Sequence, residues 1–127
     1  MEPSIFLPVW MLLGAIHGAL TRYYLTLVCA QKIGGNFPFG TFLINLSGSF
    51  LIGFLATVLQ KMSAEQWLYE FSIIGFLGAY TTFSTYALDF SNLLKVGNYK
   101  LALFYGLGSP IGGFLAVEGG IALAQHL

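Results

Sequence analysis

Apolar residues along the chain form four long runs, and short polar segments separate them. The runs predict helices over about residues 5–30, 39–60, 70–94 and 100–125. Each run is close to or above the roughly 20 residues that a helix needs to cross a bilayer. A membrane β-barrel would instead show alternating segments of about ten residues, and the sequence contains none. The pattern predicts an all-α membrane protein with four transmembrane helices, in a single transmembrane domain over residues 1–127.

The composition agrees with a protein that lies in lipid. Hydrophobic residues make up 57% of the chain and charged residues only 8%, whereas soluble domains are roughly a quarter charged. This composition predicts the lipid bilayer as a partner, and the formal net charge of zero indicates no nucleic-acid partner. Cys29 is the only cysteine, which excludes an internal disulfide and multi-cysteine metal sites. No Cys-His or Ser-His-Asp arrangement is present, and we therefore expect no enzyme.

The loop lysines are unevenly distributed between the two expected sides of the membrane. If the helices alternate in direction, Lys32, Lys95 and Lys100 share one side, with Arg22 near it, and Lys61 lies on the other. The positive-inside rule then places the first and third loops in the cytoplasm of a protein of the inner (plasma) membrane. The bias rests on few residues.

The third apolar run contains an unusual segment at residues 75–86, which reads GFLGAYTTFSTY. Its two glycines weaken a helix, and four hydroxyl residues follow within five positions. Irregular backbone is tolerated at membrane depth where it is buried in protein or lines a wet cavity. We therefore predict a break between Gly78 and Phe83. The alternative is an unbroken helix whose hydroxyls bond back to its own carbonyls.

Two further helices carry polar or small residues at four-residue spacing, which places them on one face of each helix. They are Asn45, Ser49 and Gly53 in the second run and Tyr105, Ser109 and Gly113 in the fourth. Together with the break, these stripes favour a solute path lined by neutral hydrogen-bonding groups. Either stripe taken alone is better explained by hydrogen bonds between helices.

At the third-run segment the sequence resembles the Fluc (CrcB) fluoride-channel family, whose signature there is Gly-Phe-x-Gly-Gly-x-Thr-Thr-Phe-Ser-Thr-Phe. Two other blocks agree with that family: residues 14–23 read GAIHGALTRY and residues 40–45 read GTFLIN. The resemblance covers the whole chain with the spacing that the family has.

The resemblance implies an antiparallel, dual-topology dimer with two pores at the subunit interface. Phe83 resembles a phenylalanine whose positive ring edge meets the anion, and Arg22 resembles an arginine near the pore entrance. The polar pore residues that the resemblance implies are Asn45, Ser84, Tyr105 and Ser109. Backbone carbonyls of Gly78 and Thr81 resemble the ligands of a central structural sodium ion at the dimer interface.

The chain departs from the family pattern at several positions. Tyr86 stands where a second pore phenylalanine is expected, so its hydroxyl must find a partner. On this basis we expect Tyr86→Phe to conduct at least as well as the parent protein. The other departures are Ala79, Pro110, Gly113, Val117 and Glu118.

The leading functional hypothesis is a fluoride-selective channel that exports cytoplasmic fluoride down its electrochemical gradient. Its partners would be fluoride and a second, antiparallel copy of the chain. One alternative is a subunit of a heterodimeric channel, paired with a homologous subunit of opposite orientation. Another is a small multidrug-type proton-coupled antiporter, which needs a carboxylate in the first helix. Here that helix has Arg22 and no acid, and Glu118 lies on the fourth.

Overall fold

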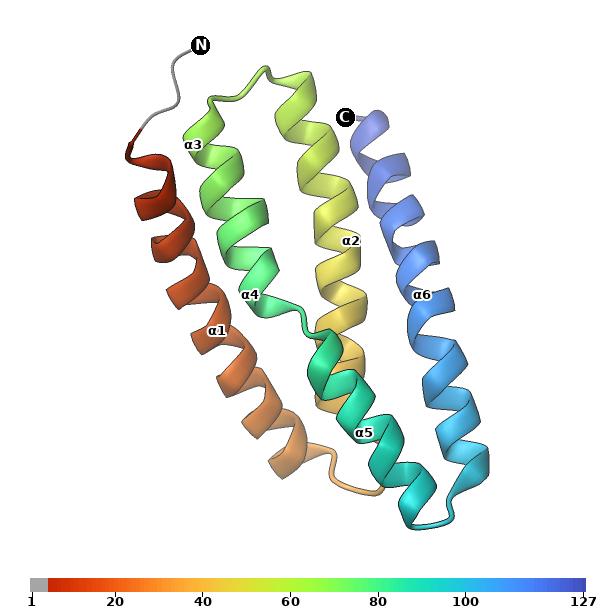
Figure 1. Cartoon of the computed structure of the whole chain (residues 1–127). Helices are drawn as coiled ribbons and strands as arrows, with labels where there is room; N and C mark the ends of the chain where they lie inside the picture. Colours follow the sequence, from red (N-terminus) through yellow and green to blue (C-terminus); the bar gives the residue numbers. More distant parts are fainter. Residues whose placement is uncertain (1–4) are drawn as a thin grey trace.

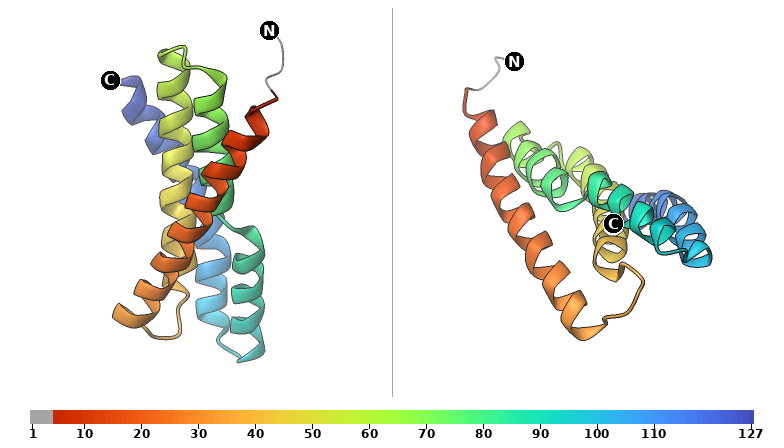
Figure 2. Two further views of the ribbon diagram at one scale, coloured as in Figure 1. Left: turned by 90° about the vertical axis from the view of Figure 1, so that its left-hand side faces the viewer. Right: turned by 60° about the horizontal axis from the view of Figure 1, so that its bottom comes forward.

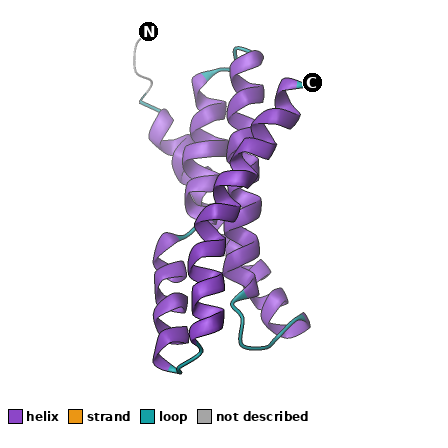
Figure 3. Cartoon of the chain, turned by 90° about the vertical axis from the view of Figure 1, so that its right-hand side faces the viewer, coloured by secondary structure: helices purple, strands orange, loops and turns teal. Residues whose placement is uncertain are grey.

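The computed structural model describes residues 5–127, and over these residues the chain is helical without any strand (Figure 3). The third apolar run is divided into several short helices, one of which is a π-helix, η1. In chain order the elements are α1 (Leu7–Lys32), α2 (Phe39–Lys61), α3 (Gln66–Tyr69), η1 (Glu70–Leu77), α4 (Gly78–Tyr80), α5 (Phe83–Lys95) and α6 (Tyr99–Gln125).

The segments run in alternate directions along the long axis of the molecule (Figure 1). Loops 33–38 and 96–98 therefore lie at one end, and loop 62–65 lies at the other end with the C-terminus. Helices α1 and α6 form the two flanks, with α2 and the divided third segment between them. The most extensive packing joins α2 to α6 and α1 to η1. Figure 2 shows that α1 is inclined to the other helices. The C-terminal end of α1 diverges from them.

Two of the described helices, α2 and α6, are long and apolar enough to cross a membrane. The outer faces of the flanking helices expose many large apolar side chains, such as Leu12, Ile16 and Leu20 on α1 and Leu107, Ile111 and Phe114 on α6. An aqueous surface would rarely carry such faces, whereas lipid suits them. The wider prediction of four transmembrane helices stays a prediction.

Glycines allow the backbones of neighbouring helices to approach one another closely. A Cβ atom on Gly18 of α1 would overlap the main-chain carbonyl of Phe76 in η1. On α2, a Cβ atom on Gly53 would overlap the carbonyl of Val117 in α6 in the same way. Small residues commonly permit such contacts between membrane helices. At both positions glycine therefore lets two helices of the same chain pack closely against each other.

The π-helix is a feature that the hydrophobic pattern did not predict. Periodicity indicated an ordinary helix leading into the break, but residues Glu70–Leu77 form wider turns. Such turns are rare and often lie next to functional sites. Here η1 packs along α1 and leads directly into α4 and the break.

We predict that Gly18→Ala lowers the stability of the folded protein, because the added methyl group meets backbone rather than a movable side chain. Overpacking of this kind costs about 1–3 kcal/mol. Thermal unfolding of the purified protein would measure it. Gly119→Ala is the matched control, since its Cβ would have only the ring of Phe50 within reach, at 4.0 Å. Equal melting temperatures for both variants would contradict the packing argument.

Candidate functional site

The third segment is interrupted at Thr81 and Thr82, inside the interval that the sequence predicts. Helix α4 ends at Tyr80 and α5 begins at Phe83. Between them both threonines are extended, with φ and ψ of −80° and 156° at Thr81 and −150° and 121° at Thr82. An extended pair within a helical segment frees backbone polar groups that need other partners.

Asn45 of α2 supplies partners for both backbone groups of Thr82. Its Nδ2 donates to the Thr82 carbonyl at 2.8 Å, and its Oδ1 accepts from the Thr82 N–H at 2.8 Å. In an unbroken helix that N–H would instead bond to the carbonyl of Gly78. The Asn45 side chain thus holds the break open and satisfies the displaced peptide groups.

The side chain of Thr82 likewise replaces a backbone carbonyl as a hydrogen-bond acceptor. Its Oγ1 accepts from the N–H of Thr85 at 3.2 Å and so caps the start of α5. In a continuous helix the Thr85 N–H would bond to the Thr81 carbonyl. The carbonyls of Gly78 and Thr81 have therefore both lost their usual helical donors. Carbonyl oxygens of this kind are suitable ligands for a hard cation.

Two further residues of α2 lie against Tyr80, at the end of α4, and against Thr81 in the break. The hydroxyl of Ser47 lies 2.9 Å from the hydroxyl of Tyr80, which is buried. A Cβ atom on Gly48 would overlap the methyl group of Thr81, so only glycine leaves room there. Asn45, Ser47 and Gly48 together form the surface on α2 that fixes the position of the break.

Beside the break lies an open cleft of about 280 Å³ between α2, α5 and α6. Its lining is neutral: Asn45, Ser49, Ile52, Thr81, Thr82, Phe83, Tyr86, Ser109 and Pro110. The Oγ atom of Ser109 is buried and has no hydrogen-bond partner among the described residues. A buried hydroxyl without a partner requires an explanation, such as a water molecule or ion.

A row of aromatic rings leads from the cleft along α5 and α6. The ring centroids of Phe83 and Tyr86 are 5.7 Å apart, and those of Tyr86 and Tyr105 are 5.2 Å apart. The fully buried Tyr105 donates its hydroxyl to Oδ2 of Asp89 at 3.3 Å. Phe83 is 78% exposed, so its ring projects from the surface of the single chain.

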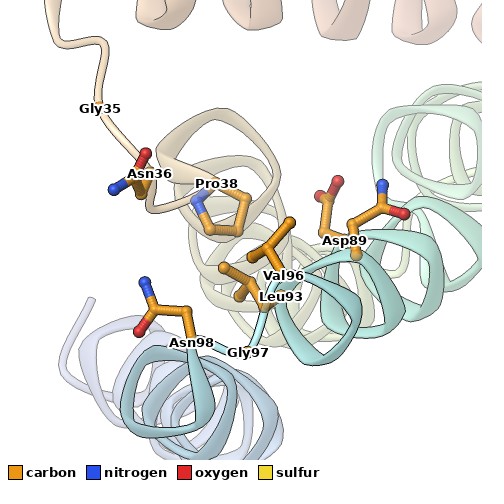
Figure 4. A pocket seen from close by; sticks show the side chains of 9 residues that line it. Gly35, Asn36, Pro38, Asp89, Leu93, Val96, Gly97 and Asn98 are labelled. Atoms are coloured by element: carbon orange, nitrogen blue, oxygen red, sulfur yellow. The ribbon is translucent and has the colours of Figure 1, made fainter.

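Asp89 also borders a polar pocket of about 750 Å³ at the end of the molecule that holds loops 33–38 and 96–98 (Figure 4). The side chains of Asn36 and Asn98 approach this pocket from the two loops. The row of rings therefore joins the end pocket to the cleft beside the break.

The structure brings together some of the predicted site residues and leaves others apart. Asn45, Phe83, Tyr86, Ser109 and Thr81 line the cleft, and Tyr105 packs behind Tyr86. Neither Ser84, which is exposed on α5, nor Gly78, exposed on α4, lines it. Arg22 lies half-buried on α1, away from the cleft of the same chain.

The role of Thr82 as the cap of α5 is a feature that the sequence did not predict. Threonine is a favoured N-cap residue at the start of a helix, and this preference is the signal that could have indicated Thr82. The hydroxyl cluster at residues 81–85 hid this signal, because all of its members suit the same position.

These features define a class: an all-α protein with membrane-capable helices, in which a broken helix borders a small cleft of neutral hydrogen-bonding groups. Residues 9–121 match the family described as CrcB-like protein, Camphor Resistance (CrcB). The chain belongs to this family.

Full-length relatives carry a more specific name. The chain is 44% identical over 126 residues to the fluoride-specific ion channel FluC of Synechococcus sp. (strain JA-2-3B'a(2-13)), an alignment that covers 98% of this chain and 97% of that protein. It is 47% identical over 126 residues to FluC of Trichormus variabilis (strain ATCC 29413 / PCC 7937), with 98% and 92% covered. FluC of Synechocystis sp. (strain ATCC 27184 / PCC 6803 / Kazusa) is 42% identical over 130 residues, with 100% and 98% covered.

We predict that Asn45→Leu destabilises the protein, because both backbone groups of Thr82 lose their partner. Each buried polar group left unsatisfied costs about 1–3 kcal/mol. Asn92→Leu is the matched control, since Asn92 is exposed near the end of α5. A melting temperature of Asn45→Leu equal to that of the control would show that the Asn45 bonds do not hold the break.

Proposed function

We propose that this protein is a fluoride-selective channel through which cytoplasmic fluoride leaves the cell down its electrochemical gradient. The observation that carries the proposal is the buried Ser109 hydroxyl without a partner among the described residues, in a cleft that Phe83 and Asn45 also line. The names of the full-length relatives support the choice of fluoride as the ion.

The chemistry of the cleft suits a small anion that must pass quickly. Hydroxyl and amide groups donate hydrogen bonds to an anion without the strong hold of a fixed positive charge. Asn45 uses one of its two amide hydrogens for Thr82, which leaves the second for the cleft. The edge of the Phe83 ring carries partial positive charge and adds a weak, directional attraction for the anion.

The exposed polar groups at the break support a dimer with pores at its interface. Gly78, Ser84 and Thr85 are exposed near the middle of the third segment, next to the projecting ring of Phe83. The hydroxyls of Ser84 and Thr85 contact the Thr82 hydroxyl, but the carbonyl of Gly78 has lost its helical donor. Hydrocarbon offers it no water as a replacement, and an unsatisfied polar group costs several kcal/mol there. A second copy in antiparallel orientation would cover this surface and bring the two breaks together.

A sodium ion fits the carbonyl groups at this proposed interface. Gly78 and Thr81 both have carbonyls whose helical donors bond elsewhere, and oxygen ligands suit a hard cation. Two antiparallel copies would contribute both carbonyls twice. The ion would supply positive charge and a link between subunits, and the chain's own part is to hold the carbonyls in place through Asn45 and Thr82.

A proton-coupled antiporter is less well supported. It requires a carboxylate that the transported cation and the proton share. Helix α1 offers Arg22 instead, and Glu118 is exposed on α6 and does not line the cleft. We propose that the channel is a multi-pass protein of the inner (plasma) membrane.

Reconstituted liposomes loaded with fluoride or chloride test the proposal directly. With the potential clamped by a potassium ionophore, we expect rapid fluoride efflux and much slower chloride efflux, each followed with an ion-selective electrode. Equal rates for the two anions would overturn selectivity, and no efflux of either anion would overturn the channel itself.

Phe83→Ile should abolish fluoride efflux while the dimer stays folded, because isoleucine keeps much of the apolar bulk and loses the polarised ring edge. Leu88→Ile is the matched control, since Leu88 is also exposed on α5 and lies outside the cleft. Size-exclusion chromatography would verify assembly of both. Near-parent efflux in Phe83→Ile would remove that ring from the anion path.

The orientation of the chain is a separate part of the proposal. Lys32, Lys95 and Lys100 lie at one end of the structure, and Lys61 at the other end donates to the carbonyl of Ala124. An antiparallel homodimer needs each chain to insert in both orientations, and a single added charge can reverse a small membrane protein. We propose a dual-topology homodimer, and the lysine imbalance keeps a heterodimer as the second candidate.

A C-terminal tag on the chain expressed alone distinguishes the two. We expect a membrane-impermeant reagent to label the tag in similar amounts from both sides of the membrane. Adding a lysine to loop 62–65, at the same end as the C-terminus, is the control that should shift labelling towards the cytoplasmic side. Labelling from one side only would reject the homodimer and indicate an oppositely oriented partner.

A further inference from the structure

Pro110 lies inside α6, in the wall of the cleft. Proline has no backbone N–H, so it cannot bond to the carbonyl four residues earlier in the helix. In α6 that carbonyl belongs to Gly106. Within a membrane-spanning helix, a carbonyl freed in this way needs a new donor.

The new donor comes from another helix. The hydroxyl of Tyr86 in α5 donates to the carbonyl of Gly106 at 2.5 Å. Tyr86 and Pro110 are both departures from the family pattern, and the structure places them on either side of the same carbonyl group. The proline removes a donor, and the tyrosine supplies one.

We propose that Tyr86 is a positioning residue that acts as a unit with Pro110. Its hydroxyl replaces the missing backbone donor of α6 and fastens the middle of α6 to α5. The ring of Tyr86 is thereby fixed against Tyr105 and Phe83. A phenylalanine at this position would keep the ring but lose the bond that sets its orientation.

The same bond keeps Ser109 available to the cleft. A serine in a helix commonly turns its hydroxyl back to the carbonyl three or four residues earlier, which for Ser109 means Gly106 or Tyr105. Tyr86 already occupies the Gly106 carbonyl, and the Ser109 Oγ has no partner among the described residues. Loss of the Tyr86 hydroxyl would offer Ser109 an internal partner and withdraw it from the anion path.

The bond from Tyr86 to Gly106 reverses the expectation for Tyr86→Phe. From the sequence alone, that variant should conduct at least as well as the parent. With the hydrogen bond between α5 and α6 lost and Ser109 turned away from the cleft, we expect lower stability and a several-fold lower fluoride efflux. The effect on efflux rests on the proposed channel function, whereas the effect on stability does not.

A double-mutant cycle tests the coupling. The four proteins are the parent, Tyr86→Phe, Pro110→Ala and the double variant, and the readouts are melting temperature and fluoride efflux. We expect Tyr86→Phe to lower the melting temperature by about 4 °C. In the Pro110→Ala background the N–H of the new alanine can bond to the Gly106 carbonyl, so removal of the hydroxyl should cost little there. Tyr99→Phe is the matched control, because Tyr99 is exposed at the start of α6.

The outcomes separate the two proposals. Recovery of the melting temperature in the double variant supports the coupling even if the parent protein conducts no fluoride. An equal loss from Tyr86→Phe with and without Pro110 would overturn the coupling, as would a melting temperature of Tyr86→Phe equal to the parent's. A second outcome combines a recovered melting temperature in the double variant with parent-like fluoride efflux in Tyr86→Phe. That outcome would limit Tyr86 to a structural role and overturn its effect on Ser109.

Discussion

The need to satisfy backbone polar groups away from water governs this structure. At the break, the N–H of Thr81 still makes its helical bond to Leu77, but Thr82 does not continue the pattern. One side chain, Asn45, binds both backbone groups of Thr82. A hydrocarbon environment offers no water to take over that role. This pair of hydrogen bonds holds Thr82 in place and frees the Gly78 carbonyl, and the Thr82 hydroxyl frees the Thr81 carbonyl by capping α5.

The same constraint explains why α5 and α6 are joined where they are. Pro110 interrupts the bonding of α6, and the Tyr86 hydroxyl restores a donor from α5. In both places a side chain from a neighbouring helix replaces a bond that the backbone has lost. The cleft lies between the Asn45–Thr82 bonds and the Tyr86–Gly106 bond, so hydrogen bonds hold its walls. The Ser109 hydroxyl in the cleft has no partner among the described residues.

Close packing between helix backbones also supports this arrangement. Glycines let α1 approach η1 and let α2 approach α6 at backbone distance. These contacts fix the two pairs of helices as units, and Asn45 joins them through the break. The surface around Phe83 remains exposed on the single chain, which is consistent with the proposed antiparallel partner.

Hydrophobic periodicity and the hydroxyl cluster predicted the helical character and the interval of the break, because both depend on local sequence. The resemblance of three short blocks identified the family, and Asn45, Phe83, Tyr86 and Ser109 line the cleft. Local sequence did not reveal the π-helix, the choice of Thr82 as the cap or the partner of the Tyr86 hydroxyl. The last two depend on contacts between residues far apart in the chain, since Asn45 holds Thr82 in its extended form and Tyr86 reaches Gly106. Only the packed helices determine which donor meets which displaced carbonyl.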